Sequence, residues 1–325
     1  MKTLLVTGGS GFIGSNFIRR FLLTHNDWKV LNLDLLTYAG NPENCKDFSG
    51  NSRYEFIQGD ICDGARIKNL MPKANALINF AAETHVDRSI DESQSFLLTN
   101  ILGLKVLLDH ARACRVDPFV HISTDEVYGS LATGSADEDA PMAPNSPYSA
   151  AKASGDLLAR SYWKTYGYPV KIVRSSNNFG PYQFPEKVIP LFITNLLEGK
   201  KVPLYGKGEN RREWIYVEDN CDAIQIVFDK GEPGEIYNIS AGNEISNREL
   251  TTHLLKALGA GDERIDYVQD RPGHDFRYSI KTDKLNQLGF KPRWNFHEAL
   301  KQTITWYQSN PQWWKPLKRD KFTLK

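Results

Sequence analysis

Cysteine is scarce in this chain, and its cysteines do not stand at a metal-binding spacing. The four residues are Cys45, Cys62, Cys114 and Cys221, with no Cys-x-x-Cys pair and no histidine at zinc-finger spacing from them. Structural metal sites need such closely spaced ligands, so we expect no metal. Free thiols stay reduced in the cytoplasm, which is where we expect the protein to be.

The chain also lacks a large net charge and a long hydrophobic run near its start. Forty Lys and Arg face 39 Asp and Glu, which leaves a net charge of +1. A basic surface for nucleic acid or an anionic membrane is therefore not expected. Residues 4–6 form only a short apolar run before a glycine cluster, too short for a signal-peptide core or a membrane span. We expect neither a nucleic-acid nor a membrane partner.

What is present is the composition of an ordinary globular protein. The 325 residues are 41% hydrophobic, and at about 150 residues per domain they suggest one large domain or two. In the first half, short apolar runs alternate with longer stretches of helical period, which is typical of β-α-β units and a parallel sheet. The strands are predicted at residues 3–7, 30–34, 54–58, 76–80, 118–123 and 170–175.

From Gly180 onward, prolines and glycines divide the chain into shorter pieces, which indicates a second, smaller unit. A predicted helix at 219–228 and a strand at 235–239 could rejoin the sheet. We therefore expect an α/β fold: a Rossmann-type doubly wound parallel sheet with a smaller, partly interleaved C-terminal substrate-binding domain. Residues 1–179 would form the sheet domain, with 212–242 rejoining it, and 180–325 would mainly form the smaller domain.

A glycine-rich turn follows the first predicted strand and precedes a helical pattern. Gly8, Gly11 and Gly14 have the spacing Gly-x-x-Gly-x-x-Gly, with Phe12 and Ile13 between the last two glycines, and a helical pattern begins with Asn16, Phe17 and Ile18. Glycine permits positive φ and close backbone approach, and a helix start offers free N–H groups to a pyrophosphate. A tight turn without a ligand is the alternative. The context favours a dinucleotide site.

Two acidic residues follow the next strands. Asp34 ends the second strand, where a carboxylate can accept hydrogen bonds from a ribose diol and repel a 2′-phosphate. This position favours NAD over NADP. Asp60, after the third strand, either caps a helix or contacts the adenine, and the sequence leaves both open.

The fifth predicted strand ends in Thr124, Asp125 and Glu126. This is the carboxyl edge of the sheet, where open α/β folds bind ligands. Neighbouring residues of an extended chain point in opposite directions, so the two carboxylates could address different substrate atoms with different pKa values. A solvated acidic turn is the alternative.

Tyr148 and Lys152 stand four positions apart at the start of a predicted helix and so share one face. A nearby ammonium favours the phenolate, and we expect it to lower the pKa of Tyr148 enough to make a usable base. The spacing also arises by chance, but here it accompanies a dinucleotide site.

With these residues the chain resembles the extended short-chain dehydrogenase/reductase family, in its branch of NAD-dependent nucleotide-sugar epimerases and dehydratases. The resemblance covers essentially the whole chain and is closest to the sugar 4,6-dehydratases. Phe179 and Phe276 depart from the usual pattern, outside the catalytic set. The matching motifs are LTYAGN (36–41), HVDRSI (85–90), STDEVYG (123–129), NNFGPYQ (177–183), NRREW (210–214) and DRPGHD (270–275).

The resemblance implies a reaction in three steps, with NAD regenerated at the end. Tyr148, helped by Lys152, would take the proton of the sugar 4-hydroxyl while hydride leaves C4, and Thr124 would hydrogen-bond that hydroxyl. Glu126 would remove the C5 proton while Asp125 protonates the departing 6-hydroxyl. Hydride would return to C6, which leaves a 4-keto-6-deoxy sugar.

The resemblance also implies which residues contact the cofactor and the nucleotide sugar. On the cofactor side, besides those above, they are Ile61, Ala81, Thr99 and Asn178. Tyr205 or Trp214 could stack on the base or belong to the core, and arginines alone are often surface charges. On the nucleotide-sugar side they are His85, Thr124, Asn177, Glu186, Lys187, Val188, Pro203, Tyr205, Arg212, Asn247, Arg271 and His274.

The stretch 96–113 is apolar around more of a helix than one sheet face requires. Deep burial within one subunit is one explanation. A homodimer interface made with the helix at 149–166 is the other, and we expect this dimer.

The sequence also allows rival functions. They are a 4-epimerase or a UDP-glucuronate decarboxylase on the same scaffold, or an NAD-binding regulator without catalysis. Oxidation and reduction at C4 alone need no acid and base aimed at C6 and C5, so the Asp125–Glu126 pair favours the dehydratase.

Overall fold

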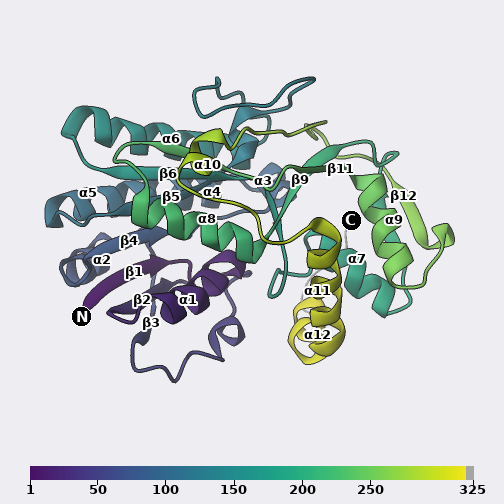
Figure 1. Ribbon diagram of the computed structural model, residues 1–325, viewed down its shortest axis with the longest axis horizontal. Coiled ribbons are helices and arrows are strands. Elements are labelled where there is room, and N and C mark those ends of the chain that lie inside the picture. The colour runs from purple at the N-terminus through teal and green to yellow at the C-terminus, as the bar shows by residue number, and fades with distance from the viewer. Residues whose placement is uncertain (320–325) are drawn as a thin grey trace.

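A seven-stranded parallel sheet forms the centre of the larger half of the molecule in the computed structural model, which describes residues 1–319 (Figure 1). Its order is β10-β6-β5-β4-β1-β2-β3, with every neighbouring pair parallel. From β1 the chain adds β2 and β3 on one side, and then β4, β5 and β6 on the other. The order of the strands therefore reverses between β1 and β4, which is where doubly wound folds bind ligands. The strands are β1 (Lys2–Thr7), β2 (Trp28–Asp34), β3 (Tyr54–Gln58), β4 (Ala76–Asn79), β5 (Phe119–Thr124), β6 (Val170–Ser175) and β10 (Ile236–Ile239).

Helices cover both faces of this sheet, as the sequence predicted. In β1, Leu4 and Val6 join the apolar cluster that contains α1 (Phe12–Thr24) and α8 (Val217–Lys230). Leu5, between them, faces the other cluster. Alternate side chains of a buried strand thus fill two cores, and this is the Rossmann-type doubly wound fold. The second cluster contains α2 (Gly64–Leu70), α5 (Leu104–Cys114) and α6 (Pro147–Tyr166).

The apolar stretch at 96–113 is not one regular helix. It comprises α4 (Gln94–Leu97), a π-helical segment (Leu98–Gly103) and then α5. Asn100, inside the π-helical segment, binds the backbone of Glu83 with both ends of its amide, at 3.0 and 3.1 Å. Such π-helical turns often occur at functional sites, and this one holds the loop that follows β4.

Most of the chain beyond β6 builds the smaller half around a separate core. One small sheet has the order β11-β9-β7, and β12 pairs with β8. The strands are β7 (Asn177–Phe179), β8 (Val202–Tyr205), β9 (Arg211–Tyr216), β11 (Asn243–Ser246) and β12 (Ile265–Val268). The helices are α7 (Val188–Leu197), α9 (Asn247–Ala257), α11 (Phe296–Ser309) and α12 (Pro311–Arg319). Short elements complete the chain: α3 (Val86–Asp91), α10 (Asp283–Gln287) and 3-10 turns at Pro42–Cys45, Met71–Lys73, Asp125–Tyr128 and Asp262–Arg264.

The two halves interleave. After β9 the chain returns to the large sheet, where α8 covers one face and β10 pairs with β6. The segment 212–242 thus rejoins the sheet through α8 and β10. Its first part, β9, does not join the large sheet. It is the middle strand of the small sheet, between β7 and β11.

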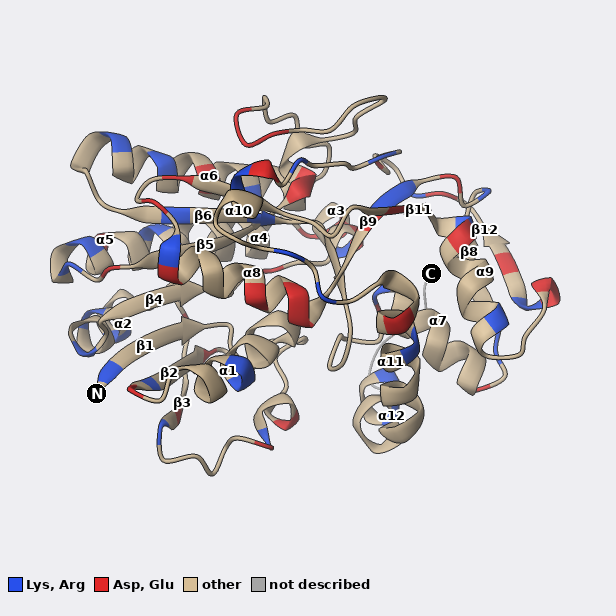
Figure 2. Ribbon diagram, viewed as in Figure 1, with Lys and Arg blue, Asp and Glu red and all other residues tan. Residues whose placement is uncertain are grey.

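Charges of both signs are distributed over both halves (Figure 2). Among residues 1–319, no helix is both long enough and apolar enough to cross a bilayer.

Candidate active site

The glycine turn between β1 and α1 is tightly packed against its own backbone. Gly8 has φ +70, and a Cβ at Gly14 would lie 2.4 Å from the carbonyl oxygen of Gly8. Gly11 begins α1 without a side-chain cap from the described chain. The first N–H groups of α1 are therefore available to an anion, as a pyrophosphate site requires.

Asp34 lies beside this turn at the end of β2. Its two oxygens accept backbone N–H groups from Ser10 and Leu36, each at 2.8 Å. Burial raises the pKa of Asp34, and these two hydrogen bonds oppose the rise. Each carboxylate oxygen keeps a second lone pair, so the group suits a ribose diol.

The other predicted cofactor residues surround the same edge of the sheet. Asp60 accepts the N–H of Cys62 at 2.8 Å, whereas Asp63 caps α2; of the two interpretations of Asp60, helix capping is therefore wrong. Ile61 is buried beneath the π-helical segment, which also carries Thr99. Ala81 packs against Gly8.

Asn178, in β7, supports a ligand at this place. Its amide nitrogen donates to the carbonyl of Ser176 at 3.0 Å. Its Oδ1 is buried and accepts no hydrogen bond from residues 1–319. A buried amide oxygen without a partner is costly, so the glycine turn, Asp34 and Asn178 together fit a dinucleotide.

At the end of β5, Asp125 and Glu126 begin a 3-10 turn instead of continuing the extended chain that the sequence predicted. The hydroxyl of Thr124 caps the turn by accepting the N–H of Glu126 at 3.3 Å. Burial, and then the charges of Glu126 and Glu213, raise the pKa of Asp125 well above its ordinary value. Burial also raises the pKa of Glu126, but the cations Arg212, Arg271 and Lys187 oppose that rise. The arrangement suits a protonated acid at Asp125 and a base at Glu126.

Tyr148 and Lys152 share the buried face of α6, as expected, but their electrostatics differ from the sequence-based expectation. Burial, and then the charge of Glu126, raise the pKa of Tyr148, while a hydrogen bond with Thr124 lowers it. Lys152 donates to the carbonyl oxygen of Ile122 at 2.5 Å, and burial lowers its pKa to about 8. The expected lowering of the Tyr148 pKa is therefore wrong, because burial and the neighbouring carboxylates raise it.

Behind this pair lies a buried polar network that sequence reasoning missed. Thr7 donates to Asn79 at 2.6 Å, and Asn79 donates to Nδ1 of His121 at 3.2 Å. Nε2 of His121 lies 3.8 Å from Asp156, which also accepts a 2.8 Å hydrogen bond from Arg174. Asp156 raises the pKa of Lys152 against the effect of burial. The signal that could have found it is position: Asp156 follows Lys152 by one helical turn.

Three of the predicted nucleotide-sugar residues, Lys187, Arg212 and Arg271, lie close enough to Glu126 to act on its pKa. Glu186 is buried, with Nε2 of His85 at 3.6 Å. Lys187 donates to the carbonyl oxygen of Thr84 at 3.1 Å. Burial, and then Lys187, lower the pKa of His85 to about 3. His85 is thus neutral, and the positive charge that faces Glu126 comes from Lys187 and the arginines.

Arg271 is held by Asp87, a residue that sequence reasoning did not assign to the site. The two side chains are 2.5 Å apart, and Nε of Arg271 is buried without an acceptor in the described part of the chain. Asp87 also lies 3.5 Å from the hydroxyl of Tyr205. Tyr205 meets the ring of His274 edge to face, with ring centroids 5.9 Å apart. Arg271, Tyr205 and His274 therefore form one cluster with a free guanidinium donor.

Arg212 lies close to Asp125 and Glu126, but its guanidinium group donates to backbone carbonyl oxygens. It donates to the carbonyl oxygens of Arg211 and Asp275 at 2.7 and 2.8 Å. Trp214, the alternative for base stacking, is buried against Phe179 and belongs to the core. Asn177 has a buried Oδ1 without a donor among residues 1–319, which again fits a ligand.

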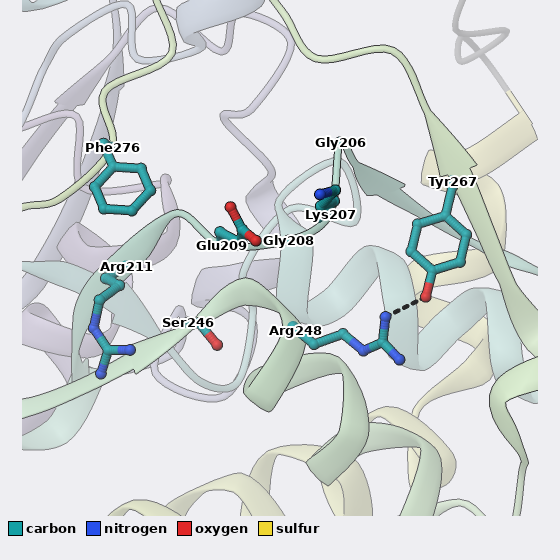
Figure 3. A pocket seen from close by; sticks show the side chains of 9 residues that line it. All are labelled: Gly206, Lys207, Gly208, Glu209, Arg211, Ser246, Arg248, Tyr267 and Phe276. Atoms are coloured by element: carbon teal, nitrogen blue, oxygen red, sulfur yellow. Dashed lines mark hydrogen bonds between the residues drawn. The ribbon is translucent and has the colours of Figure 1, made fainter.

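A hollow of about 900 Å³ opens beside these residues (Figure 3). Its lining includes Gly206, Arg211 and Ser246, each next in sequence to a predicted substrate residue: Tyr205, Arg212 and Asn247. On its other side, Arg248 donates to the hydroxyl of Tyr267. Pro203 lies in β8 and Val188 begins α7, in the same half of the molecule. The five predicted catalytic residues do not line this hollow.

Comparison with known proteins gives the family context of this arrangement. The sequence profile of GDP-mannose 4,6 dehydratase matches residues 5–303. A dTDP-glucose 4,6-dehydratase of Streptomyces niveus is 50% identical over 97% of this chain and 95% of its own length. The crystal structure of a dTDP-glucose 4,6-dehydratase from Streptomyces venezuelae with NAD bound is similar, with a TM-score of 0.95, 48% identity and coverage of 97% of this chain and 99% of that chain. A UDP-glucose 4-epimerase of Thermus thermophilus in complex with NAD has a TM-score of 0.87 and 28% identity, over 95% and 99% of the two chains.

Proposed function

The chain belongs to the GDP-mannose 4,6 dehydratase family, and we propose that within it the protein is a dTDP-glucose 4,6-dehydratase. It is an NAD-dependent hydro-lyase. The reaction oxidises C4 of the glucose, eliminates water across C5 and C6 and reduces C6. The product is dTDP-4-keto-6-deoxy-glucose, a precursor for deoxysugar synthesis.

NAD is held by the backbone of the Gly8–Gly14 turn and by Asp34, with Asn178 supplying an amide oxygen. When bound, NAD supplies a hydride acceptor that later acts as donor, and its oxidised form adds a positive charge to the site. Asp34 selects the unphosphorylated ribose. Asp60, Ile61, Ala81 and Thr99 complete the proposed cofactor side.

Tyr148 is the proposed base for the 4-hydroxyl proton. Burial raises its pKa, so a neighbouring positive charge is needed to favour the phenolate. Lys152 is the protein's own cation here, and Asp156 keeps it charged by opposing the effect of burial. Thr124, hydrogen-bonded to Tyr148, orients the same substrate hydroxyl.

The 4-ketone makes the C5 proton acidic, and the two carboxylates then divide the elimination. Glu126, with cations opposing the rise of its pKa, takes the C5 proton. Asp125, whose pKa burial raises well above its ordinary value, gives its proton to the 6-hydroxyl, which leaves as water. Glu126 gains one proton and Asp125 loses one, so the protons of the elimination step balance.

At the other end of the substrate, Arg271 and Arg212 suit a diphosphate because guanidinium groups offer several donors to phosphate oxygens. Lys187 adds a third cation. Tyr205 and His274 offer ring surfaces at the nucleotide end, and Pro203, Asn247 and Val188 lie on the neighbouring elements. His85, Asn177 and Glu186 supply neutral and acidic contacts for the sugar.

The observation that carries this function is the division between Asp125 and Glu126 beside Tyr148 and Lys152. An epimerase has no use for an acid at C6 and a base at C5. A catalytically silent NAD-binding protein would not need four competent groups together. The 50% identity to a dehydratase, against 28% to an epimerase, agrees with this argument.

Isotope transfer tests the reaction directly. With dTDP-glucose deuterated at C4, the dehydratase carries the deuterium to C6 of the product. An epimerase returns it to C4, and a silent protein leaves the substrate unchanged. Deuterium at C6 supports the proposal, and either other result contradicts it.

We also propose a homodimer. Leu97, Leu98, Leu102 and Leu157 are 48, 43, 50 and 54% exposed, although Leu104, Leu107 and Leu108 are fully buried. Deep burial within one subunit therefore does not account for the whole stretch. The exposed leucines lie on α4, the π-helical segment and α6, which pack together. This apolar face suits a second copy of the same chain.

We further propose a division into two domains and a location for the protein. Residues 1–179, with 212–242, would be the NAD-binding domain, and the rest of 180–325 mainly the nucleotide-sugar domain. The cytoplasm is the proposed location, in agreement with four free cysteines.

A further inference from the structure

The last described helix, α12, reaches from the smaller half of the molecule to the loop that follows β2. The indole N–H of Trp313 donates to Oδ1 of Asn44 at 2.9 Å. These residues are far apart in sequence, and Asn44 lies in the turn Pro42–Cys45. The hydrogen bond therefore joins the two halves at a place outside the catalytic cluster.

Asn44 passes this contact on to the phosphate-binding turn. Its Nδ2 donates to the carbonyl oxygen of Ser10 at 2.9 Å. An indole nitrogen can only donate, so it fixes Oδ1 of Asn44 toward Trp313 and Nδ2 toward Ser10. Arg19 steadies the same residue by donating to the Asn44 carbonyl oxygen at 2.8 Å. Asn44 is 1% exposed, so water does not readily replace these partners.

Ser10 is the residue through which the turn is held. Its N–H donates to Asp34 at 2.8 Å, and its hydroxyl accepts from Asn32 at 3.1 Å. Its carbonyl oxygen accepts both from Asn44 and from the N–H of Asn41, the latter at 3.0 Å. The orientation of the Gly8–Gly14 turn relative to Asp34 thus depends on contacts to Ser10.

We propose that Trp313 and Asn44 are positioning residues for the cofactor: the hydrogen-bond line Trp313–Asn44–Ser10 holds the phosphate-binding turn in the shape that retains NAD. This inference rests on the proposed NAD-dependent function. Neither residue touches the reacting atoms. Their loss raises the rate at which NAD leaves, without changing the chemistry of the enzyme that keeps its cofactor.

The ring of Trp313 has a separate structural role, which the test must leave intact. It packs against Trp306 and Tyr182, with ring centroids 5.0 and 5.9 Å away. Trp313→Phe keeps an aromatic ring in this cluster and removes only the indole donor. Trp314→Phe is the matched control: it lies in the same helix and loses its own indole hydrogen bond, to Tyr307 at 2.8 Å, which does not lead to the turn.

The experiment compares the NAD content of the purified holoenzymes and their NAD dissociation constants by titration. One lost hydrogen bond of ordinary strength corresponds to about three- to tenfold weaker binding. We expect this loss in Trp313→Phe, with activity restored by excess NAD and an unchanged KM for dTDP-glucose. Trp314→Phe should hold NAD like the wild type, even if its unfolding temperature falls.

Asn44→Ser, alone and combined with Trp313→Phe, tests whether Trp313 acts on the phosphate-binding turn through Asn44. Asn44→Ser removes the shared partner, so Trp313→Phe should add little further loss of NAD in that background. Additive losses, equal losses in Trp314→Phe, or wild-type NAD affinity in Trp313→Phe would each overturn the inference. A wild-type protein that holds no NAD would contradict the proposed function as well, which separates the two failures.

Discussion

The hydroxyl of Thr124 donates to Oδ1 of Asp125 at 3.3 Å, while Oδ2 of the same carboxyl is buried without a partner in residues 1–319. The pKa of Asp125 is raised well above its ordinary value, by burial first and by Glu126 next. A carboxylate in this position is unfavourable, but a protonated acid is not. The raised pKa therefore favours the protonated acid, the form that can donate a proton to a leaving group.

Asp125→Asn should separate the two halves of the reaction. Asparagine matches the neutral acid in shape but has no proton to give, so oxidation at C4 proceeds and elimination stalls. We expect a 10²- to 10⁴-fold slower formation of product, with reduced-cofactor absorbance that builds up on adding dTDP-glucose.

Tyr148→Phe is the counterpart, because it removes the base for the first proton. It should give neither product nor reduced-cofactor absorbance. If both variants lack the absorbance signal, the assignment of separate roles to Asp125 and Tyr148 is contradicted.

Lys152 is expected to reduce stability while it serves catalysis. Its pKa falls from 10.5 to about 8 because of burial, so the unfolded chain binds more protons between these two pH values. Stability should therefore rise with pH through this window, and the charged lysine should cost on the order of 3 kcal/mol at pH 7. Lys152→Met should unfold at a higher temperature at pH 7, with little activity, and lose this advantage above about pH 10.

Thermal unfolding of the NAD-free proteins at pH 7 and pH 10 measures this effect. Lys164→Met is the control, since Lys164 is exposed on the same helix and should change little. A Lys152→Met variant less stable than the wild type at pH 7 would show that the hydrogen bond to Ile122 outweighs the cost of burial.

Two glycines of the phosphate-binding turn should respond differently to alanine. At Gly14 a Cβ would lie 2.4 Å from the Gly8 oxygen and 2.8 Å from the Gly9 Cα, so the turn must shift. Even without NAD, Gly14→Ala should lower the free energy of unfolding by about 1–3 kcal/mol, and the unfolding temperature with it. At Gly11 the nearest atom is 3.3 Å away and φ is −78.

Gly11→Ala should therefore fold normally and lose affinity for NAD, because the added methyl group stands where the pyrophosphate approaches. Calorimetry with and without NAD distinguishes the two variants. Equal unfolding temperatures for both NAD-free proteins would refute the distinction.

The proposed dimer depends on the exposed leucines near α6. Leu102→Glu or Leu157→Glu should give a monomer in sedimentation velocity, because a carboxylate cannot be buried there unpaired. Leu23→Glu, at a leucine of α1 that is 76% exposed, is the control and should leave the assembly intact. A monomeric wild type, or a dimer unaffected by Leu102→Glu, would contradict the proposal.

The sequence predicted the parts of this molecule that depend on local pattern. The apolar runs gave the strands of the large sheet within a residue or two, and the run at 235–239 is β10 beside β6. Gly8, Asp34, Asp125 and Lys152 stand at strand ends or a helix start, so their common edge followed from the topology.

What the sequence could not predict depends on contacts between distant segments. The π-helical segment reflects the bond of Asn100 to Glu83, and the role of Asp87 follows from Arg271, far along the chain. The pKa of Tyr148 was predicted wrongly because only Lys152 was visible in the sequence. The burial of the phenol and the charge of Glu126 appear only in the fold.

The most direct test of the account is the mass of the product. The purified protein is incubated separately with dTDP-glucose, UDP-glucose and CDP-glucose, without added reductant. We predict that dTDP-glucose alone loses one water, about 18 mass units, as expected if Asp125 and Glu126 perform the elimination. An unchanged mass with a galactose configuration would mean that these two carboxylates have no role in elimination and that the protein is an epimerase.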